Sequence, residues 1–307
     1  MSIQSIITNF QNIKQEKLTN RFFKHQNIVE LLSILSDAFE VTELGKSVNN
    51  KSINAVKWGK GKTKIMLWSQ MHGDEPTATA AIFDLLNFFT NIHQHQELKN
   101  NILSSCTLYF IPVINPDGME KFTRRNAQEI DINRDFLAQQ SPEGKILRTI
   151  REKIKPNFAF NLHDQDSLYS IPKSKLPVGI SLLAPAFDES LTINWNREQA
   201  IKVIICMNET LQKLIPQQVG KFNDEFEPRA FGDNFQKAGT ATILIESGSL
   251  LNDLEKQMIE ITLDLDKYWK GKNDLTIASK ALIMTPGPLA IKSAENFAGM
   301  FSAKVVE

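Results

Sequence analysis

The sequence predicts an α/β domain in which helices alternate with the strands of a largely buried central sheet. Some segments carry apolar residues at the spacing of an amphipathic helix, and between them lie short segments that are apolar almost throughout. The second kind is typical of strands buried on both faces. Regular alternation of the two is the pattern of an α/β fold, and 42% hydrophobic residues in a chain of 307 are ample for its core.

Up to residue 115 the expected order is helix, strand, strand, helix, strand. Asn27 and Glu30 are spaced as a capping box at the start of the first helix. A glycine-containing turn separates the next two strands, and a Pro-Asp-Gly turn ends the third. Pro76 suits the first turn of the second helix, because no hydrogen bond needs its missing N–H there. These elements are expected at 27–39, 52–59, 63–70, 76–90 and 105–115.

From residue 141 onward the expected order is helix, strand, helix, strand, helix. Ser141 is placed as an N-cap, with Pro142 at the first helical position, and Pro216 stops the next helix. These elements are expected at 141–156, 157–163, 189–216, 238–247 and 254–269.

Charge and composition argue against several classes of partner. The 35 basic and 35 acidic residues cancel, so no overall field favours nucleic acid or an anionic membrane. Only Cys106 and Cys206 occur, which excludes a dense disulfide framework and fits a reducing compartment. We find no secretory signal and no apolar run near the ~18 residues of a membrane helix. We therefore expect a cytoplasmic protein with neither a nucleic-acid nor a membrane partner; its oligomeric state is left open.

Polar side chains follow three of the expected strands at the point where each strand ends: His72, His163 and Glu246. Ligands of open α/β sheets bind at the carboxyl ends of the strands, where loops bring polar groups together. With Glu75, the two histidines form a His/His/carboxylate set, the ligand type of a catalytic zinc. Each residue alone has an ordinary explanation as a chance motif or a hydrogen-bonded polar residue. Their joint placement favours a metal site.

The remaining histidines have no such placement. His25 lies near the expected first helix, and His93 and His95 fall in a segment expected to be a solvated helix end and loop.

A second polar cluster occupies residues 124–136 and follows a strand and a turn. The planar fork of an arginine such as Arg134 matches a carboxylate, and Asn133 beside it adds a donor. The cluster therefore fits either a site for an anionic substrate end or a solvated loop.

Five motifs, "HGDE", "NPDG", "DINRDF", "NLHD" and "ILIES", occur in this order and together resemble the zinc carboxypeptidase (metallocarboxypeptidase) family over residues 41–250. The chain resembles a bacterial-type cytoplasmic member of this family. The resemblance implies an α/β/α sandwich on a mixed, largely parallel sheet. We expect one catalytic domain at 1–270, opening with a helical segment at 1–40. The final segment is richer in small residues and is broken by Pro286 and Pro288, so we expect residues 271–307 to be a C-terminal extension packed on the same domain.

The resemblance also assigns roles to individual residues. It implies one zinc ion per chain, held by His72, Glu75 and His163. Glu246 matches the catalytic glutamate, which takes a proton from water and passes it to the leaving amine. Asn133 and Arg134 match the pair that holds the terminal carboxylate of the substrate. Arg124 matches the arginine that stabilises the oxyanion, with Arg125 as the alternative one position away.

The activity implied is zinc-dependent hydrolysis of an amide bond next to a free carboxylate, as in a metallocarboxypeptidase that removes C-terminal residues from peptides. Residues 221–235 lack the tyrosine expected before the catalytic glutamate of digestive enzymes, and the loop from Arg134 to His163 is short. Both departures leave two alternative functions open. One is an N-acyl-amino-acid deacylase of the succinylglutamate desuccinylase or aspartoacylase kind, and the other is a murein-peptide amidase. In such an enzyme Arg229 is either a contact for a substrate anion or a surface charge. A non-catalytic binding module with the same fold is the last alternative.

Overall fold

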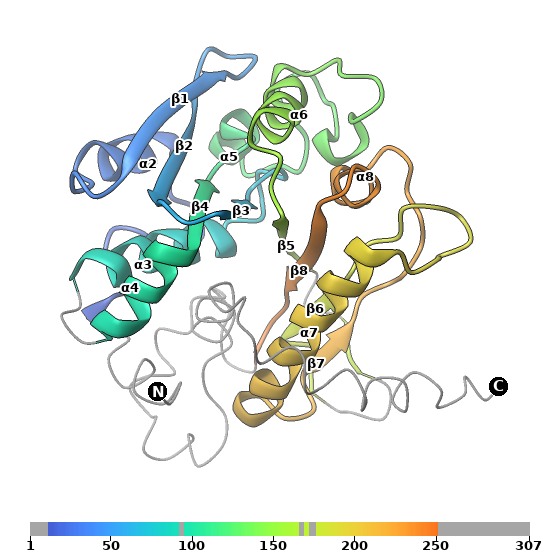
Figure 1. Ribbon diagram of the computed structural model, residues 1–307. Coiled ribbons are helices and arrows are strands. Elements are labelled where there is room, and N and C mark those ends of the chain that lie inside the picture. Colours follow the sequence, from blue (N-terminus) through green and yellow to red (C-terminus); the bar gives the residue numbers. More distant parts are fainter. Residues whose placement is uncertain (1–11, 92–94, 166–168, 172–175, 251–307) are drawn as a thin grey trace.

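A computed structural model describes residues 12–91, 95–165, 169–171 and 176–250. Its described strands form one sheet in the order β1-β2-β4-β3-β5-β8-β6-β7 (Figure 1). The strands are β1 Glu40–Lys46, β2 Ser52–Gly59, β3 Thr63–Trp68, β4 Cys106–Ile111, β5 Phe158–Asp164, β6 Ile180–Leu183, β7 Val219–Lys221 and β8 Ala241–Ser247. The helical elements are α2 His25–Ser33, α3 Thr77–Asn91, α4 Gln96–Ser105, α5 Pro116–Lys121, the 3₁₀ turn η2 Ile132–Arg134, α6 Pro142–Ile154, α7 Trp195–Leu214 and α8 Phe231–Lys237.

The sheet is mixed and largely parallel, as predicted. Strands β4, β3, β5 and β8 pair in parallel at its centre. The antiparallel pairs β1/β2, β2/β4 and β6/β8 lie to either side. The carboxyl ends of the four central strands therefore meet at one edge of the sheet.

Alternate residues of the central strands pack into two cores on opposite faces. Ile65 and Leu67 of β3 belong to the first core, whose helical residues come mainly from α3 and α7. Met66 and Trp68 belong to the second core, which includes Leu147 of α6 and residues of α8. Because successive side chains of a strand point to opposite faces, helices cover both sides of the sheet. This confirms the α/β/α sandwich.

The first helix differs from its prediction at both ends. It begins at His25 and ends at Ser33, whereas 27–39 was expected. Asn27 lies inside the first turn, where its side chain accepts a hydrogen bond from the backbone N–H of Lys24 at 2.8 Å. The chain then enters β1, which was not predicted because its residues are mostly exposed.

Other differences concern short elements. The Pro-Asp-Gly sequence starts α5 instead of a turn, because the side chain of Asn115 accepts a hydrogen bond from Gly118 N at 2.8 Å and caps the helix. Helix α4 replaces the expected solvated loop, and β6, β7 and α8 were not predicted. The helix expected at 254–269 and the extension at 271–307 lie outside the described residues. In the described ranges, no helix has the length and hydropathy that crossing a membrane requires.

We predict that Ile132→Ala lowers the free energy of unfolding by about 2–5 kcal/mol, the usual cost of truncating a buried aliphatic side chain. Ile132 is fully buried in the second core. The control is Ile193→Ala, since Ile193 is 61% exposed and exposed substitutions change stability by roughly 0.5 kcal/mol or less. Urea unfolding of both variants measures the difference, and equal losses would contradict the assignment of Ile132 to the core.

Candidate active site

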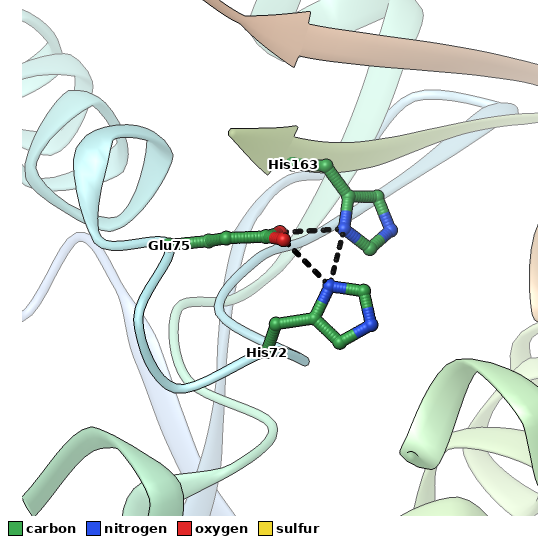
Figure 2. A group of neighbouring side chains, drawn as sticks. All are labelled: His72, Glu75 and His163. Carbon is green, nitrogen blue, oxygen red and sulfur yellow. Dashed lines mark hydrogen bonds and ion pairs between the residues drawn. The ribbon is translucent and has the colours of Figure 1, made fainter. Parts of the chain in front are cut away.

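Three side chains from two segments converge at the carboxyl edge of the sheet (Figure 2). His72 lies in the loop after β3, Glu75 lies just before α3, and His163 lies near the end of β5. β3 and β5 are neighbouring parallel strands, so their ends bring the two histidines together. All three residues are buried.

The ligand atoms of these residues face one another. Nδ1 of His72 lies 2.7 Å from Oε1 of Glu75, and Nδ1 of His163 lies 2.7 Å from Oε2 of the same carboxylate. The two Nδ1 atoms are 3.2 Å apart. Tetrahedral zinc with Zn–N bonds of about 2.0–2.1 Å places two nitrogen ligands about 3.3 Å apart. The donor set and its spacing therefore fit zinc.

The carboxylate of Glu75 carries the negative charge of this group. Burial alone would raise its pKa, but the imidazoles of His163 and His72 outweigh burial and hold the pKa well below its usual range. Glu75 is thus ionised at neutral pH, as a metal ligand must be.

Asp131 and Arg124 surround the ligand group. Oδ1 of Asp131 lies 3.2 Å from Nε2 of His72, the ring nitrogen opposite the proposed ligand atom. Such a carboxylate fixes the orientation and tautomer of a metal-binding histidine. Arg124 pairs with Oδ2 of Asp131 at 3.0 Å and lies 3.5 Å from Oε1 of Glu75. Arg125, by contrast, donates to the carbonyl of Glu129 at 2.7 Å and is exposed. Of the two candidates, only Arg124 reaches the ligand group.

Glu246 lies near the end of β8, with its Cα paired in register to that of His163. Both side chains point to the second-core face, because Ile245 and Leu162 before them belong to the first core. Burial raises the pKa of Glu246 to about 7, Glu75 adds to the rise, and His163 opposes it. Among the described residues, none donates a hydrogen bond to the carboxylate of Glu246. The structure thus places the carboxylate of Glu246 near His163 and the proposed metal site.

Asn133 and Arg134 belong to η2, which directly follows Asp131. The carboxylate of Asp131 accepts a hydrogen bond from Asn133 N at 2.9 Å, so η2 is tied to the residue that contacts His72. Arg134 is 38% exposed at its side chain and pairs with Glu227 at 3.1 Å. Arg229 also pairs with Glu227, at 2.7 Å, and is 56% exposed at its side chain.

Gly73 lies in the loop between His72 and Glu75, where this loop packs against α5. Its φ angle is not positive, but a Cβ atom at this position would lie 2.0 Å from the backbone carbon of Gly118 in α5. Only glycine lets the loop between His72 and Glu75 pass this close to α5.

Among the described residues, His72, Glu75 and His163 are the one group able to hold a metal ion. The Nε2 of His25 lies 2.8 Å from the carbonyl of Ser52, so this buried histidine is a hydrogen-bonded structural residue. His95 precedes α4, and His93 lies outside the described residues.

Two residues near the site had no role in the sequence analysis. Asp131 could have been found, because it lies in the "DINRDF" motif and a metal-binding histidine needs a second partner. Glu227 carries no such signal, since its contact with Arg134 spans more than ninety residues of chain.

The sequence of this chain matches the zinc carboxypeptidase family over residues 25–212. The chain belongs to the zinc carboxypeptidase family. The match covers the three proposed metal ligands, Arg124, Asn133 and Arg134, but it ends before Glu246.

The first curated relatives that match part of the chain are carboxypeptidases. Carboxypeptidase SOL1 of Arabidopsis thaliana is 30% identical over 103 residues, which are 30% of this chain and 21% of that protein. The chain therefore spans about a fifth of the length of the first curated relatives it matches.

Solved structures of very low identity share the fold. A metallo-carboxypeptidase from Burkholderia cenocepacia superposes with a TM-score of 0.66 and 14% identity, covering 90% of this chain and 70% of that one. Carboxypeptidase A from Helicoverpa armigera gives a TM-score of 0.61 and 16% identity, covering 92% and 81%.

We predict that Asp131→Asn weakens zinc binding about 10- to 100-fold, the usual effect of removing the partner of a ligand histidine. The physical reason is the loss of the anion that orients His72 and increases the basicity of its ring. Competition with a zinc chelator measures the affinity. Asp37→Asn, at an exposed position, serves as the control, and equal affinities of the two variants would contradict the role of Asp131.

Proposed function

We propose that this zinc carboxypeptidase family member is a metallocarboxypeptidase that removes C-terminal residues from peptides. The observation that carries the proposal is the convergence of His72, Glu75 and His163 at the sheet edge, with Glu246 paired to His163 in the next strand. When bound, zinc supplies a Lewis acid that activates water and polarises the scissile carbonyl.

The residues around the ligand group have separate tasks in this proposal. Glu246 accepts a proton from the attacking water and donates it to the leaving amine. Arg124 directs its N–H groups at the negative charge that develops on the carbonyl oxygen. Asn133 and Arg134 hold the carboxylate of the substrate, which places the bond to be cut next to Glu246.

The second candidate keeps the chemistry and changes the substrate to an N-acyl amino acid or a murein peptide. It is favoured by the absence of tyrosine from residues 221–235, which include the segment packed against Arg134. Both candidates require a free carboxylate on the substrate. Parallel assays of short peptides, acyl-amino acids and murein peptides separate them. A cytoplasmic location and the absence of nucleic-acid and membrane partners remain predictions.

We predict that Glu246→Gln keeps the bound zinc, about one per chain, and loses hydrolysis by at least about 100-fold, because the amide cannot accept the proton. Zinc analysis and turnover on the same preparation measure both quantities. Unchanged turnover would exclude Glu246 as the base. Loss of zinc in this variant would show that the side chain has a structural role instead.

We predict that Arg124→Ala lowers kcat about 10²- to 10³-fold, the cost of removing one donor to a developing oxyanion. The matched variant is Arg125→Ala, one residue away and turned toward the carbonyl of Glu129. This variant should retain the kcat of the wild-type protein. The reverse result would transfer the oxyanion role to Arg125.

A further inference from the structure

The guanidinium of Arg134 is held on two sides by the protein. Its Nε lies 3.1 Å from Oε2 of Glu227, and its Nη1 donates to the carbonyl of Asn133 at 3.0 Å. Neither contact uses Nη2, and 38% of the side chain is exposed. The outer edge of the fork therefore remains able to meet the carboxylate of a ligand.

Glu227 is itself fixed by Arg229. The Nε of Arg229 donates to Oε1 of Glu227 at 2.8 Å, and its Nη2 donates to Oε2 at 2.7 Å, which is a bidentate pair. The backbone N–H of Glu227 donates to Oδ1 of the buried Asp233 at 3.0 Å. The hydrogen bonds from Arg229 lower the pKa of Glu227 to about 2, and the charge of Arg134 contributes. Glu227 is therefore ionised and held at both its carboxylate and its backbone.

The segment that carries these residues is attached to the segment that carries Arg134. Phe231 N donates to the side chain of Asn133 at 3.1 Å, and Phe136 N donates to the carbonyl of Arg229 at 3.2 Å. The rings of Phe136 and Phe231 meet edge to face, with centroids 5.2 Å apart. Residues 227–231 and 133–136 thus form one packed unit, in which Glu227 belongs to the scaffold around Arg134.

We propose that Glu227 and Arg229 are positioning residues, which fix the guanidinium of Arg134 so that its outer edge receives the carboxylate of the substrate. This inference rests on the proposed function, in which Arg134 binds that carboxylate. Without the pair, the long side chain of Arg134 would have to be ordered each time a substrate binds, and that ordering reduces affinity. If Glu227 instead competed with the substrate carboxylate for Arg134, removal of its charge would lower KM.

The test measures KM and kcat of the zinc-loaded full chain on a short peptide with a free C-terminal carboxylate. We expect Glu227→Gln to raise KM about 10-fold with kcat nearly unchanged, because the lost contact affects ground state and transition state alike. Glu227→Asp keeps the charge and should return KM part of the way to the wild-type value. Arg229→Gln should also raise KM. This variant tests the Glu227–Arg229 pair in a chain that retains both Glu227 and Arg134.

The matched control is Glu152→Gln, which breaks another Arg–Glu pair, with Arg148 at 3.0 Å on the surface of α6. It should leave KM unchanged. In a double-mutant cycle, Glu227→Gln should add nothing once Arg134 has been replaced by alanine, because Glu227 acts through Arg134. Zinc content and the unfolding midpoint, measured on every variant, show that the change in KM does not come from lost metal or lost folding.

The remaining outcomes separate a failure of the positioning role from a failure of the proposed function. If Arg134→Ala raises KM but Glu227→Gln leaves it unchanged or lowers it, the positioning role is wrong and the proposed function stands. An additive effect of Glu227→Gln in the Arg134→Ala background also overturns the positioning role. If Arg134→Ala itself leaves KM unchanged, the carboxylate-binding role of Arg134 is wrong and the positioning role falls with it.

Discussion

A buried carboxylate between two imidazoles is the constraint on which the site depends. Removing the Glu75 charge from water is costly, and only closely placed partners offset that cost. His72 and His163 supply them at 2.7 Å, from segments ninety-one residues apart. This proximity requires β3 and β5 to be parallel neighbours that end together, and the register that pairs Trp68 with Asn161 meets the requirement. The group thus prearranges the donor atoms that zinc needs.

The two cores explain how the other residues reach this group. Strand alternation sends His163 and Glu246 to the face covered by α6 and α8, and the buried Ile132 attaches η2 to the same core. Asp131, just before Ile132, is thereby held against His72, while Asn133 just after it contacts Phe231 at the start of α8. One apolar core therefore supports both the segment beside the metal ligands and the segment expected to hold the substrate.

Features that depend on local pattern could be predicted from the sequence, and features that depend on distant contacts could not. The apolar strand patterns near His72, His163 and Glu246 predicted the edge of the sheet at which the metal ligands meet, because the carboxyl ends of parallel strands lie together. The "NPDG" sequence was assigned to a turn, although capping by Asn115 starts a helix there. Strands β6 and β7 have four and three residues, too few for a period to be recognised. Arg124 was preferred to Arg125 from the family resemblance, and the ion pair between Arg124 and Asp131 is a contact that the sequence alone does not show.

The family match ends between two groups of residues near the site. The metal ligands lie inside residues 25–212, whereas Glu227, Arg229 and Glu246 lie beyond. Holding zinc demands a fixed donor set and spacing, which a shared family pattern can encode. The segment packed against Arg134 lies beyond the match, and it presents an Arg–Glu–Arg chain of ion pairs. The family therefore indicates the metal, while the proposed positioning of Arg134 depends on contacts made by residues 227–231.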